Sequence, residues 1–434
     1  MTRRELIKLA TSVAYVPLLA GALASAGCSG GAGDSVLLVG GDGYPGTDDQ
    51  LLDEIEAAAF LYYWEQTDPA TGQIKDRALA SGNDTRTLSS IAATGFGLTA
   101  LCIGDQRGYM PSQQIAARVQ ATLQFIRDQL QGQNGFFYHF VDMSTGARAG
   151  SSEVSSIDTA ILLCGVLTCR AHFPLTQIAS LATQIYQQVN WPWMLNGGAT
   201  LAMAWTPESG FAAGRWDHYS ELMMLYLLAI GSPTYPIPAS SWSAWTRPTI
   251  TYQGLTYISG ADPLFVHQYS HAWFDFRSRS DAYANYFQNS ITATEAHRLF
   301  CMGLSSQFAD YSSDLWGITA SDSAGGYVVW GGPPPIGPID GTVVPCAAGG
   351  SLPFVYADTI HVLRWIRGHY SQAWQRYGYV DAFNPLTGWY DGDVLGIDLG
   401  IMALMAENQR SGFVWQTFMS NPEVAAAMTL AGFG

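Results

Sequence analysis

The chain has 434 residues, 48% of them hydrophobic, which is enough to bury a large core. Its formal net charge is −15, and lysine occurs only as Lys8 and Lys75. An acidic surface repels phosphate backbones and argues against nucleic acid as a partner, whereas 14 Trp, 22 Tyr and 19 Phe residues suit stacking on a neutral ligand.

The N-terminus has the pattern of an export signal. Residues 2–8 (TRRELIK) resemble a twin-arginine signal, and an apolar run follows from Leu9 to Ala26. The stretch Ser25 to Cys28 resembles a lipobox, which would make Cys28 the lipidated first residue of the mature chain. Cleavage after the small residues without a lipid is the alternative. We predict that residues 1–27 direct export to the periplasm, with membrane or outer-membrane anchoring only through a lipid on Cys28.

Residues 28–47 are rich in glycine and predict a flexible linker. Helical periodicity follows it, with apolar residues recurring every three or four positions from Leu52 to Tyr62 and from Ile115 to Leu130. Further helices are predicted at Leu88–Cys102, Asp158–Ala171, Leu175–Val189, Ser220–Ile230, Asp281–Met302, Tyr356–His369, Asp398–Arg410 and Pro422–Ala431, with shorter ones at Trp242–Thr246 and Ser371–Tyr377.

Several of these helices are apolar on nearly every side, for example at Ala160–Val166 and Leu222–Ile230. Such helices have to be enclosed by others. Some twelve helices with an enclosed subset indicate an all-α (α/α)6 barrel, a double ring of helices formed by residues 48–434 as one domain. Long loops on such a scaffold commonly carry function, and here they span Gly132–Ser152, Asn190–Tyr219, Tyr252–Ser280 and Tyr311–Leu352.

Besides Cys28, the cysteines are Cys102, Cys164, Cys169, Cys301 and Cys346. An odd number cannot pair completely within the chain, and most of them lie in apolar surroundings. We therefore expect buried free thiols. The sequence contains no CxxC or Cys/His zinc spacing.

Residues 263–277 (PLFVHQYSHAWFDFR) mix polar and aromatic side chains. His267 and His271 have the spacing of a helical metal pair, but Gln268 stands where a zinc protease carries its general-base Glu. The leading proline and the aromatic residues favour an extended loop, so we predict no metal here. Neutral donors and acceptors suit sugar hydroxyls, and a structural loop explains the pattern equally well. The candidates for sugar contact are His267, Gln268, His271, Trp273, Asp275 and Arg277, the last two of which would pair with each other in a structural loop.

Cleavage of a glycosidic bond needs one protonated and one ionised carboxyl group on opposite sides of the sugar. Glu221 suits the protonated acid, because it follows an aromatic loop and opens an apolar helix; a first-turn Glu stabilised by the helix dipole is the alternative. Asp398 is a lone charge entering another apolar helix, which is costly unless the charge is satisfied or used. Glu153 lies in a polar loop, whereas Asp158 has the position of a capping residue. Glu407 is expected to form a surface ion pair with Arg410.

A family resemblance is carried by seven stretches of the chain. They are SSIAATGFGLTAL (89–101), GFFYHFVD (135–142), SSIDTAILLCG (155–165), YSELMMLYLLAIGSPTYPI (219–237), HQYSHAWFDFR (267–277), WGITASD (316–322) and GIDLGIMALMAENQRSGFVW (396–415). Together they resemble, in order, the bacterial glycoamylase-like family that includes the β-1,2-glucanases of glycoside hydrolase family 144. The resemblance extends over residues 50–433.

The resemblance implies an (α/α)6 barrel and a glycoside hydrolase without an essential metal or other cofactor. It implies Glu221 as general acid and, less directly, Asp398 as general base, with Glu153 and Asp158 lining the cleft. Further candidates for substrate binding are Trp216, Tyr219, Trp316 and Asp322. The expected reaction is inverting cleavage of β-1,2-glucan or sophoro-oligosaccharides. A same-fold glycosidase or transglycosylase for another linkage and a non-catalytic sugar-binding lipoprotein are the alternatives.

Overall fold

The computed structural model describes residues 41–434. The predicted export signal, Cys28 and the linker up to residue 40 lie outside this part of the chain. Within it, no helix has both the length and the apolar character needed to cross a bilayer. The last residues of the predicted linker are packed: Tyr44 is buried and donates to Glu54 (2.9 Å), and Arg364 donates to Asp42 (2.5 Å). The linker prediction is therefore wrong for this stretch.

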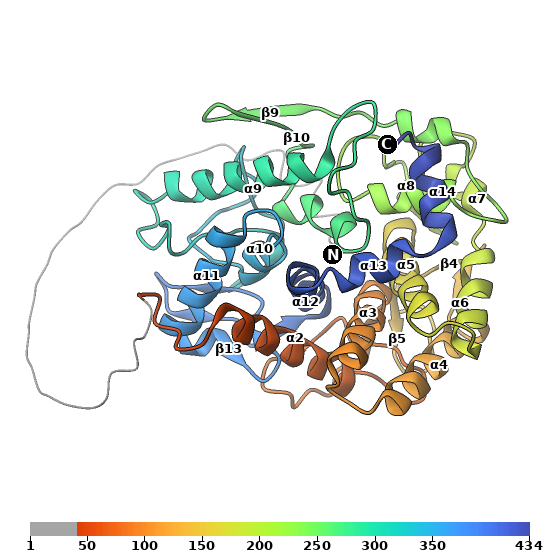
Figure 1. The fold of residues 1–434 in the computed structure, drawn as a ribbon, viewed down its shortest axis with the longest axis horizontal. Helices are drawn as coiled ribbons and strands as arrows, with labels where there is room; N and C mark the ends of the chain where they lie inside the picture. Colours follow the sequence, from red (N-terminus) through yellow and green to blue (C-terminus); the bar gives the residue numbers. More distant parts are fainter. Residues whose placement is uncertain (1–40) are drawn as a thin grey trace, which may run out of the picture.

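Helices joined by loops with short strands form the described chain (Figure 1). The α-helices are α2 (Asp48–Glu65), α3 (Ile91–Arg107), α4 (Ser112–Asp128), α5 (Ser156–His172), α6 (Gln177–Gln187), α7 (Trp191–Leu195), α8 (Met223–Ile230), α9 (Tyr286–Gly303), α10 (Pro345–Gly349), α11 (Tyr356–His369), α12 (Gly396–Arg410), α13 (Phe413–Met419) and α14 (Pro422–Leu430). The 3-10 helices are η1 (Ala239–Ser243), η2 (Leu264–His267), η3 (Tyr269–Ala272) and η4 (Ser371–Ala373).

The strands are two to four residues long and pair antiparallel. They are β1 (Arg77–Leu79), β2 (Leu88–Ser90), β3 (Gly132–Gln133), β4 (Phe136–Phe137), β5 (Phe140–Asp142), β6 (Val154–Ser155), β7 (Ala204–Thr206), β8 (Gly210–Phe211), β9 (Thr249–Tyr252), β10 (Leu255–Ile258), β11 (Ser321–Ser323), β12 (Gly326–Val328), β13 (Trp374–Gln375), β14 (Gly378–Tyr379), β15 (Phe383–Asn384), β16 (Trp389–Tyr390) and β17 (Asp393–Leu395).

The helices form an inner and an outer group. Helices α3, α5, α8 and α12 are buried along most or all of their length, whereas α4, α6 and α11 bury one face. The apolar runs Ala160–Val166 and Leu222–Ile230 are wholly buried, as predicted. Figure 1 shows α12 near the middle of the molecule, with other helices around it. The hydrophobic core therefore surrounds the inner helices.

Glycine allows two inner helices to approach closely. A Cβ atom on Gly165 of α5 would lie 2.1 Å from the carbonyl oxygen of Gly95 on α3. A Cβ atom on Gly95 would lie 2.4 Å from the carbonyl oxygen of Ile161. Because both obstacles are backbone atoms, neither position has room for a side chain, and the two helices pack backbone to backbone.

The structure differs from the predicted elements mainly where helices are short. The helix expected at Ser220–Ile230 begins only at Met223, and Trp242–Thr246 falls at the end of η1. The stretch Ser371–Tyr377 forms η4 and β13 in place of an α-helix. Helices α7, α10 and α13 were not predicted, because five to seven residues do not establish a helical period.

The strands connect the N-terminal ends of four inner helices. Strand β17 leads into α12 and pairs with β1, and Lys75 just before β1 bridges to Ser89 in β2, which leads into α3. Strand β2 pairs with β5, and Tyr138 bridges to Val154 in β6, which leads into α5. Strand β6 pairs with β7, and Ala202 bridges to Arg215 on the way to α8. The starts of α12, α3, α5 and α8 therefore lie at one end of the molecule, which we call the strand rim.

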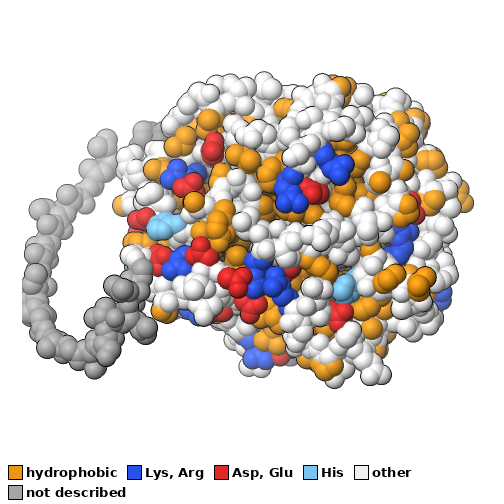
Figure 2. Space-filling view, in the orientation of Figure 1, with side chains coloured by type: hydrophobic (Ala, Val, Ile, Leu, Met, Phe, Trp, Pro, Cys, Tyr) orange, Lys and Arg blue, Asp and Glu red, His pale blue; other side chains and the backbone are white. Residues whose placement is uncertain are grey.

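The five cysteines in the described part of the chain are buried and form no disulfide, as predicted. The Sγ atoms of Cys102 and Cys169 lie 3.6 Å apart between α3 and α5. The space-filling view shows acidic and basic side chains in mixed groups on one face of the molecule (Figure 2). This distribution agrees with the many ion pairs between helices.

The prediction for Glu407 is wrong. Its side chain is fully buried and accepts from Arg107 Nε (2.8 Å), whereas Arg410 binds Asp49, Asp53 and Glu56. The spacing Glu407–Arg410 would allow a pair on the helix surface, but α2 covers this part of α12 and supplies other carboxylates.

Candidate active site

The strand rim brings together three clusters that contain the predicted acids. The first lies at the start of α12, the second at the start of α5 and the third just before α8. Asp398 and Asp158 each lie in the first turn of an inner helix, where the helix dipole favours a negative charge.

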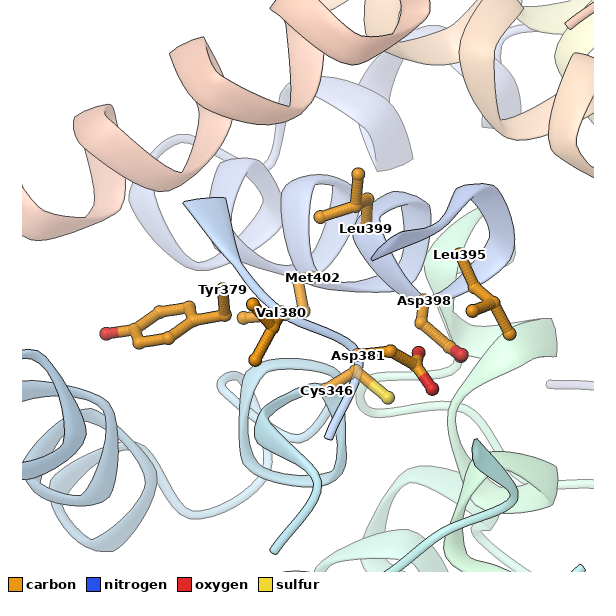
Figure 3. A pocket seen from close by; sticks show the side chains of 8 residues that line it. All are labelled: Cys346, Tyr379, Val380, Asp381, Leu395, Asp398, Leu399 and Met402. Carbon is orange, nitrogen blue, oxygen red and sulfur yellow. The ribbon is translucent and has the colours of Figure 1, made fainter. Parts of the chain in front are cut away.

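Asp398 is 4% exposed and lines a narrow hollow below the strand rim. The hollow is lined by Cys346, Tyr379, Val380, Asp381, Leu395, Asp398, Leu399 and Met402 (Figure 3). Apolar side chains form most of its wall, and the carboxyl groups of Asp381 and Asp398 lie side by side in it. Asp381 is also 4% exposed. Two buried carboxyl groups in contact cannot both carry a negative charge without a large penalty.

Asp322 and Asp391 extend this cluster towards the surface. Asp322, a predicted substrate-binding residue, is buried and accepts from the Arg77 guanidinium (2.5 Å), which also bonds to Asp76 (3.2 Å). Burial, followed by the charge of Asp398 and that of Asp322, raises the pKa of Asp381 well above its ordinary value. Burial and then the charge of Asp322 raise the pKa of Asp391 to about 7.

Asp322, Asp381 and Asp391 each offer a carboxylate oxygen, and these oxygens lie within 4.8 Å of one another. Among residues 41–434, this is the group whose carboxylate oxygens are spaced closely enough to hold a cation. The Arg77 guanidinium already balances the charge of Asp322, so we assign the group no metal.

Glu153 and Asp158 meet at His139. The Nδ1 atom of His139 lies 3.2 Å from Glu153 and 3.7 Å from Asp158, and its backbone N–H donates to the Glu153 carbonyl (2.8 Å). Ser155 caps α5 by accepting from the backbone N–H of Asp158 (3.3 Å), and its hydroxyl donates to the Asp158 carboxylate. This confirms one half of the predicted capping box, Ser155 as the N-cap of α5.

Glu221 lies in the turn that precedes α8 and is half-buried. Its backbone carbonyl accepts from the Ser270 hydroxyl (2.8 Å), which in turn accepts from the backbone N–H of Met224 (3.0 Å). Asp262 is the neighbouring acid: burial, then the charge of Glu221, raise the pKa of Asp262 to about 6, against a lowering effect of His218. A Cβ atom on Gly260 would lie 2.5 Å from Asp262 Oδ2 and 2.7 Å from the Tyr219 carbonyl, so the two segments are in contact.

The stretch 263–274 of this segment is buried rather than an extended loop. It forms η2 and η3, and Gln268 donates to the Ala347 carbonyl (2.9 Å) and to Ser351 (2.8 Å). The hydroxyl of Ser290 lies 3.1 Å from His271 Nε2, and the Trp273 indole donates to Thr99 (3.0 Å). Burial lowers the pKa of His271 to about 3. These three side chains therefore pack the interior, in place of the predicted sugar contact.

His267 is equally enclosed: its Nδ1 atom lies 3.1 Å from the Tyr219 hydroxyl, and burial lowers its pKa to about 3. Tyr219 and Trp316 are fully buried as well, which corrects the prediction that they contact substrate. Trp216 donates to Ser156 at the start of α5 (2.9 Å) and supports the strand rim. The predicted pair of Asp275 and Arg277 is confirmed at the surface (2.9 Å).

Sequence reasoning missed Asp381, Asp391, Asp262, His139 and Arg77. Two of these had a signal: His139 stands in the family-like stretch GFFYHFVD, and Asp391 in the acid-rich run YDGD before α12. Asp381 and Asp262 are single acids in loops, and only the folded chain shows which carboxyl group each one faces.

An inner group of helices with acids at their N-terminal ends is the arrangement to which the family resemblance pointed, and comparison with known proteins confirms that resemblance. The Glycoamylase family model, described as "Putative glucoamylase", matches residues 214–422. A curated protein of Parabacteroides distasonis, the exo beta-1,2-glucooligosaccharide sophorohydrolase (non-reducing end), is 29% identical over 421 residues. The match covers 88% of this chain and 57% of the relative, so the chain spans little more than half of that protein.

Solved structures are similar over nearly their whole length. The endo-beta-1,2-glucanase of Chitinophaga pinensis, solved with sophorotriose and glucose, is 27% identical with a TM-score of 0.81, and the match covers 89% of this chain and 99% of that one. A "putative glucoamylase" of Bacteroides uniformis is 26% identical with a TM-score of 0.84, covering 89% and 98%. The helix-rich fold is therefore that of glucoamylase-like proteins.

Proposed function

We propose that the protein is a glycoside hydrolase that cleaves β-1,2-glucan or sophoro-oligosaccharides. The observation that carries this proposal is the set of acids at the strand rim, on a fold similar to a glucanase of this linkage. The similarity to a sophorohydrolase supports the same substrate class. A neutral glucan also suits a chain with a formal net charge of −15, because it has no phosphate or carboxylate to be repelled.

In this proposal Glu221 protonates the departing oxygen and Asp398 draws a proton from the attacking water. Glu221 is half-buried and has Asp262 as a neighbour, and a nearby negative charge favours the protonated form of a carboxyl group. Asp398 lies in the first turn of α12, where the helix dipole favours the ionised form. Inversion requires room for a water between acid and base, about 6.5–9.5 Å from carboxyl to carboxyl, or a longer relay through water or a substrate hydroxyl.

We further propose that residues 48–434 are one catalytic domain with the (α/α)6 arrangement, in which α3, α5, α8 and α12 belong to the inner ring. Glu153 and Asp158, joined through His139, would bind sugar hydroxyls at the start of α5. We also propose that the protein is exported by the twin-arginine route and that a lipid on Cys28 holds it at a membrane. The TRRELIK stretch and the lipobox-like residues support these last two points.

The test is reducing-sugar release by the purified mature chain from β-1,2-, β-1,3-, β-1,4- and α-linked glucans. We expect activity on the β-1,2-linked substrate, a loss of at least about 100-fold in Glu221→Gln and in Asp398→Asn, and melting temperatures near wild type. Asp358→Asn is the control, because this acid lies on the outer helix α11 in an exposed pair with Arg298. Binding of β-1,2-glucan without release by the wild type would identify a sugar-binding protein. Activity on another linkage alone would refute the substrate.

A further inference from the structure

Asp381 is a buried carboxyl group that the proposed mechanism does not use. Its backbone N–H donates to the Asp393 carbonyl (3.2 Å), and its Oδ2 atom accepts from the backbone N–H of Asp322 (2.7 Å). These two bonds tie it to the strand that leads into α12 and to β11. The backbone of Asp381 is thus held by one segment and its side chain by a backbone N–H of the other.

The other carboxyl oxygen of Asp381 faces Asp398. The Oδ1 atom is buried and has no hydrogen-bond partner as long as both carboxyl groups are only acceptors. The two carboxyl groups are within hydrogen-bonding reach, and Figure 3 shows them side by side in the hollow. A proton placed between them would give this Asp381 oxygen a hydrogen bond to Asp398.

The guanidinium group beside this cluster is already engaged by other carboxylates. The nearest guanidinium, that of Arg77, is bonded to Asp76 and Asp322. The remaining acid of the cluster, Asp391, adds a further negative charge when it ionises. The wall contributed by α10 and α12 is apolar apart from the Cys346 thiol. The pair therefore has to hold a proton, because two buried carboxylates repel each other at short range.

Two observations place this proton on Asp381. Asp398 lies in the first turn of α12, where the helix dipole stabilises its ionised form, whereas Asp381 lies in a loop without such support. Burial and then the charge of Asp398 raise the pKa of Asp381 well above its ordinary value. An ionised Asp398 is also what the proposed base requires.

We propose that Asp381 is a positioning residue that remains protonated and donates a hydrogen bond to the Asp398 carboxylate, which keeps the base ionised and correctly oriented. This inference rests on the proposed function for the role of Asp398. The protonation of Asp381 does not depend on which glucan is the substrate.

Substitution by asparagine separates this role from the alternatives. In Asp381→Asn the amide oxygen can still accept from the Asp322 N–H while the NH2 group donates to Asp398, as the protonated acid does. We expect Asp381→Asn to keep kcat within about threefold of wild type, and Asp381→Ala to lose about 10- to 100-fold. Asp358→Asn serves again as the surface control. Equal losses in the Asn and Ala variants, or full activity of the Ala variant, would overturn the proposal.

Infrared spectroscopy in D2O at neutral pH gives a readout that needs no activity. The difference spectrum of wild type minus Asp381→Asn is expected to show the carbonyl band of one protonated carboxyl group. Absence of that band would refute the shared proton even if kinetics were normal. If the wild type shows the band but cleaves no glucan, the proposed function fails while the proton assignment stands.

Calcium titration of chelator-treated protein tests whether a cation balances the acids instead. Saturable binding to wild type that is lost in Asp381→Asn would overturn the proposal, because a cation between these carboxylates would replace the proton. No binding in either protein is the expected result. It supports proton sharing because the charge then has to be balanced without a metal ion.

Discussion

Replacing Glu56 by glutamine should remove a pH dependence from the stability of the protein. Glu56 is 1% exposed, and burial followed by the charge of Glu407 raises its pKa from 4.5 to about 9, against the lowering effect of Arg410 and Arg107. Since the folded-state pKa is above the unfolded one, the folded protein holds a proton that the unfolded chain has lost between pH 4.5 and 9. The stability contributed by this proton is complete below pH 4.5 and is lost as the pH rises towards 9.

The magnitude follows from the width of this window. One pKa unit corresponds to about 1.4 kcal/mol, so the contribution of Glu56 should fall by about 3 kcal/mol between pH 5 and pH 7. Glutamine keeps the shape of the protonated acid but does not titrate. We therefore expect the free energy of unfolding, measured by urea denaturation at several pH values, to fall less with rising pH in Glu56→Gln than in wild type. Glu295→Gln, an exposed acid on α9, is the matched control and should follow wild type. A difference between Glu56→Gln and wild type that stays constant with pH would refute the reasoning.

Three further predictions concern the site and its support. Trp273→Phe should lower stability by about 1–3 kcal/mol, because the indole bond to Thr99 and some side-chain volume are lost, and it should leave KM unchanged. A raised KM at an unchanged melting temperature would instead support sugar contact by Trp273. Gly165→Ala should destabilise by about 3 kcal/mol, because its Cβ would lie 2.1 Å from the Gly95 carbonyl, and a melting temperature equal to wild type would contradict this packing. In Asp262→Asn the alkaline limb of the pH profile of kcat/KM should move to lower pH by about one unit, since a negative charge beside Glu221 is removed; an unchanged limb would exclude coupling of the two acids.

The sequence predicted the long helices well because their patterns are local. The periodicity at 356–369 gave α11 with its observed ends, and the helix predicted at Asp158–Ala171 begins within two residues of α5. Short helices such as α10, entered at Pro345, were missed because they have no period. The segment around His271 shows a further limit. Mixed polar and aromatic residues occur at binding surfaces and in cores, and only the partners, here Ser290 and Trp415, distinguish the two.

The acids show the same limit at longer range. Glu221 and Asp398 could be selected from the sequence because each is a single charge beside an apolar helix. Their neighbours, Asp262 and Asp381, lie in loops 41 and 17 residues away, and no local pattern connects them. Pairing of this kind depends on how the loops settle over the helix ends, which is fixed by the packing of the whole domain.

The two acid pairs differ in a way that agrees with opposite roles. Asp398 is 4% exposed, capped by the dipole of α12 and in contact with Asp381, so the proton of that pair has a better place on Asp381 than on Asp398. Glu221 lies before the first turn of α8, outside the helix, and its neighbour Asp262 ionises near pH 6. Above that pH the charge on Asp262 favours the protonated form of Glu221. In one pair the neighbour holds the proton and leaves a base; in the other an ionised neighbour favours the protonated form that the acid needs. Removing the neighbours should therefore lower activity at opposite ends of the pH range. Asp262→Asn should lower it at the alkaline end, and Asp381→Ala at the acidic end.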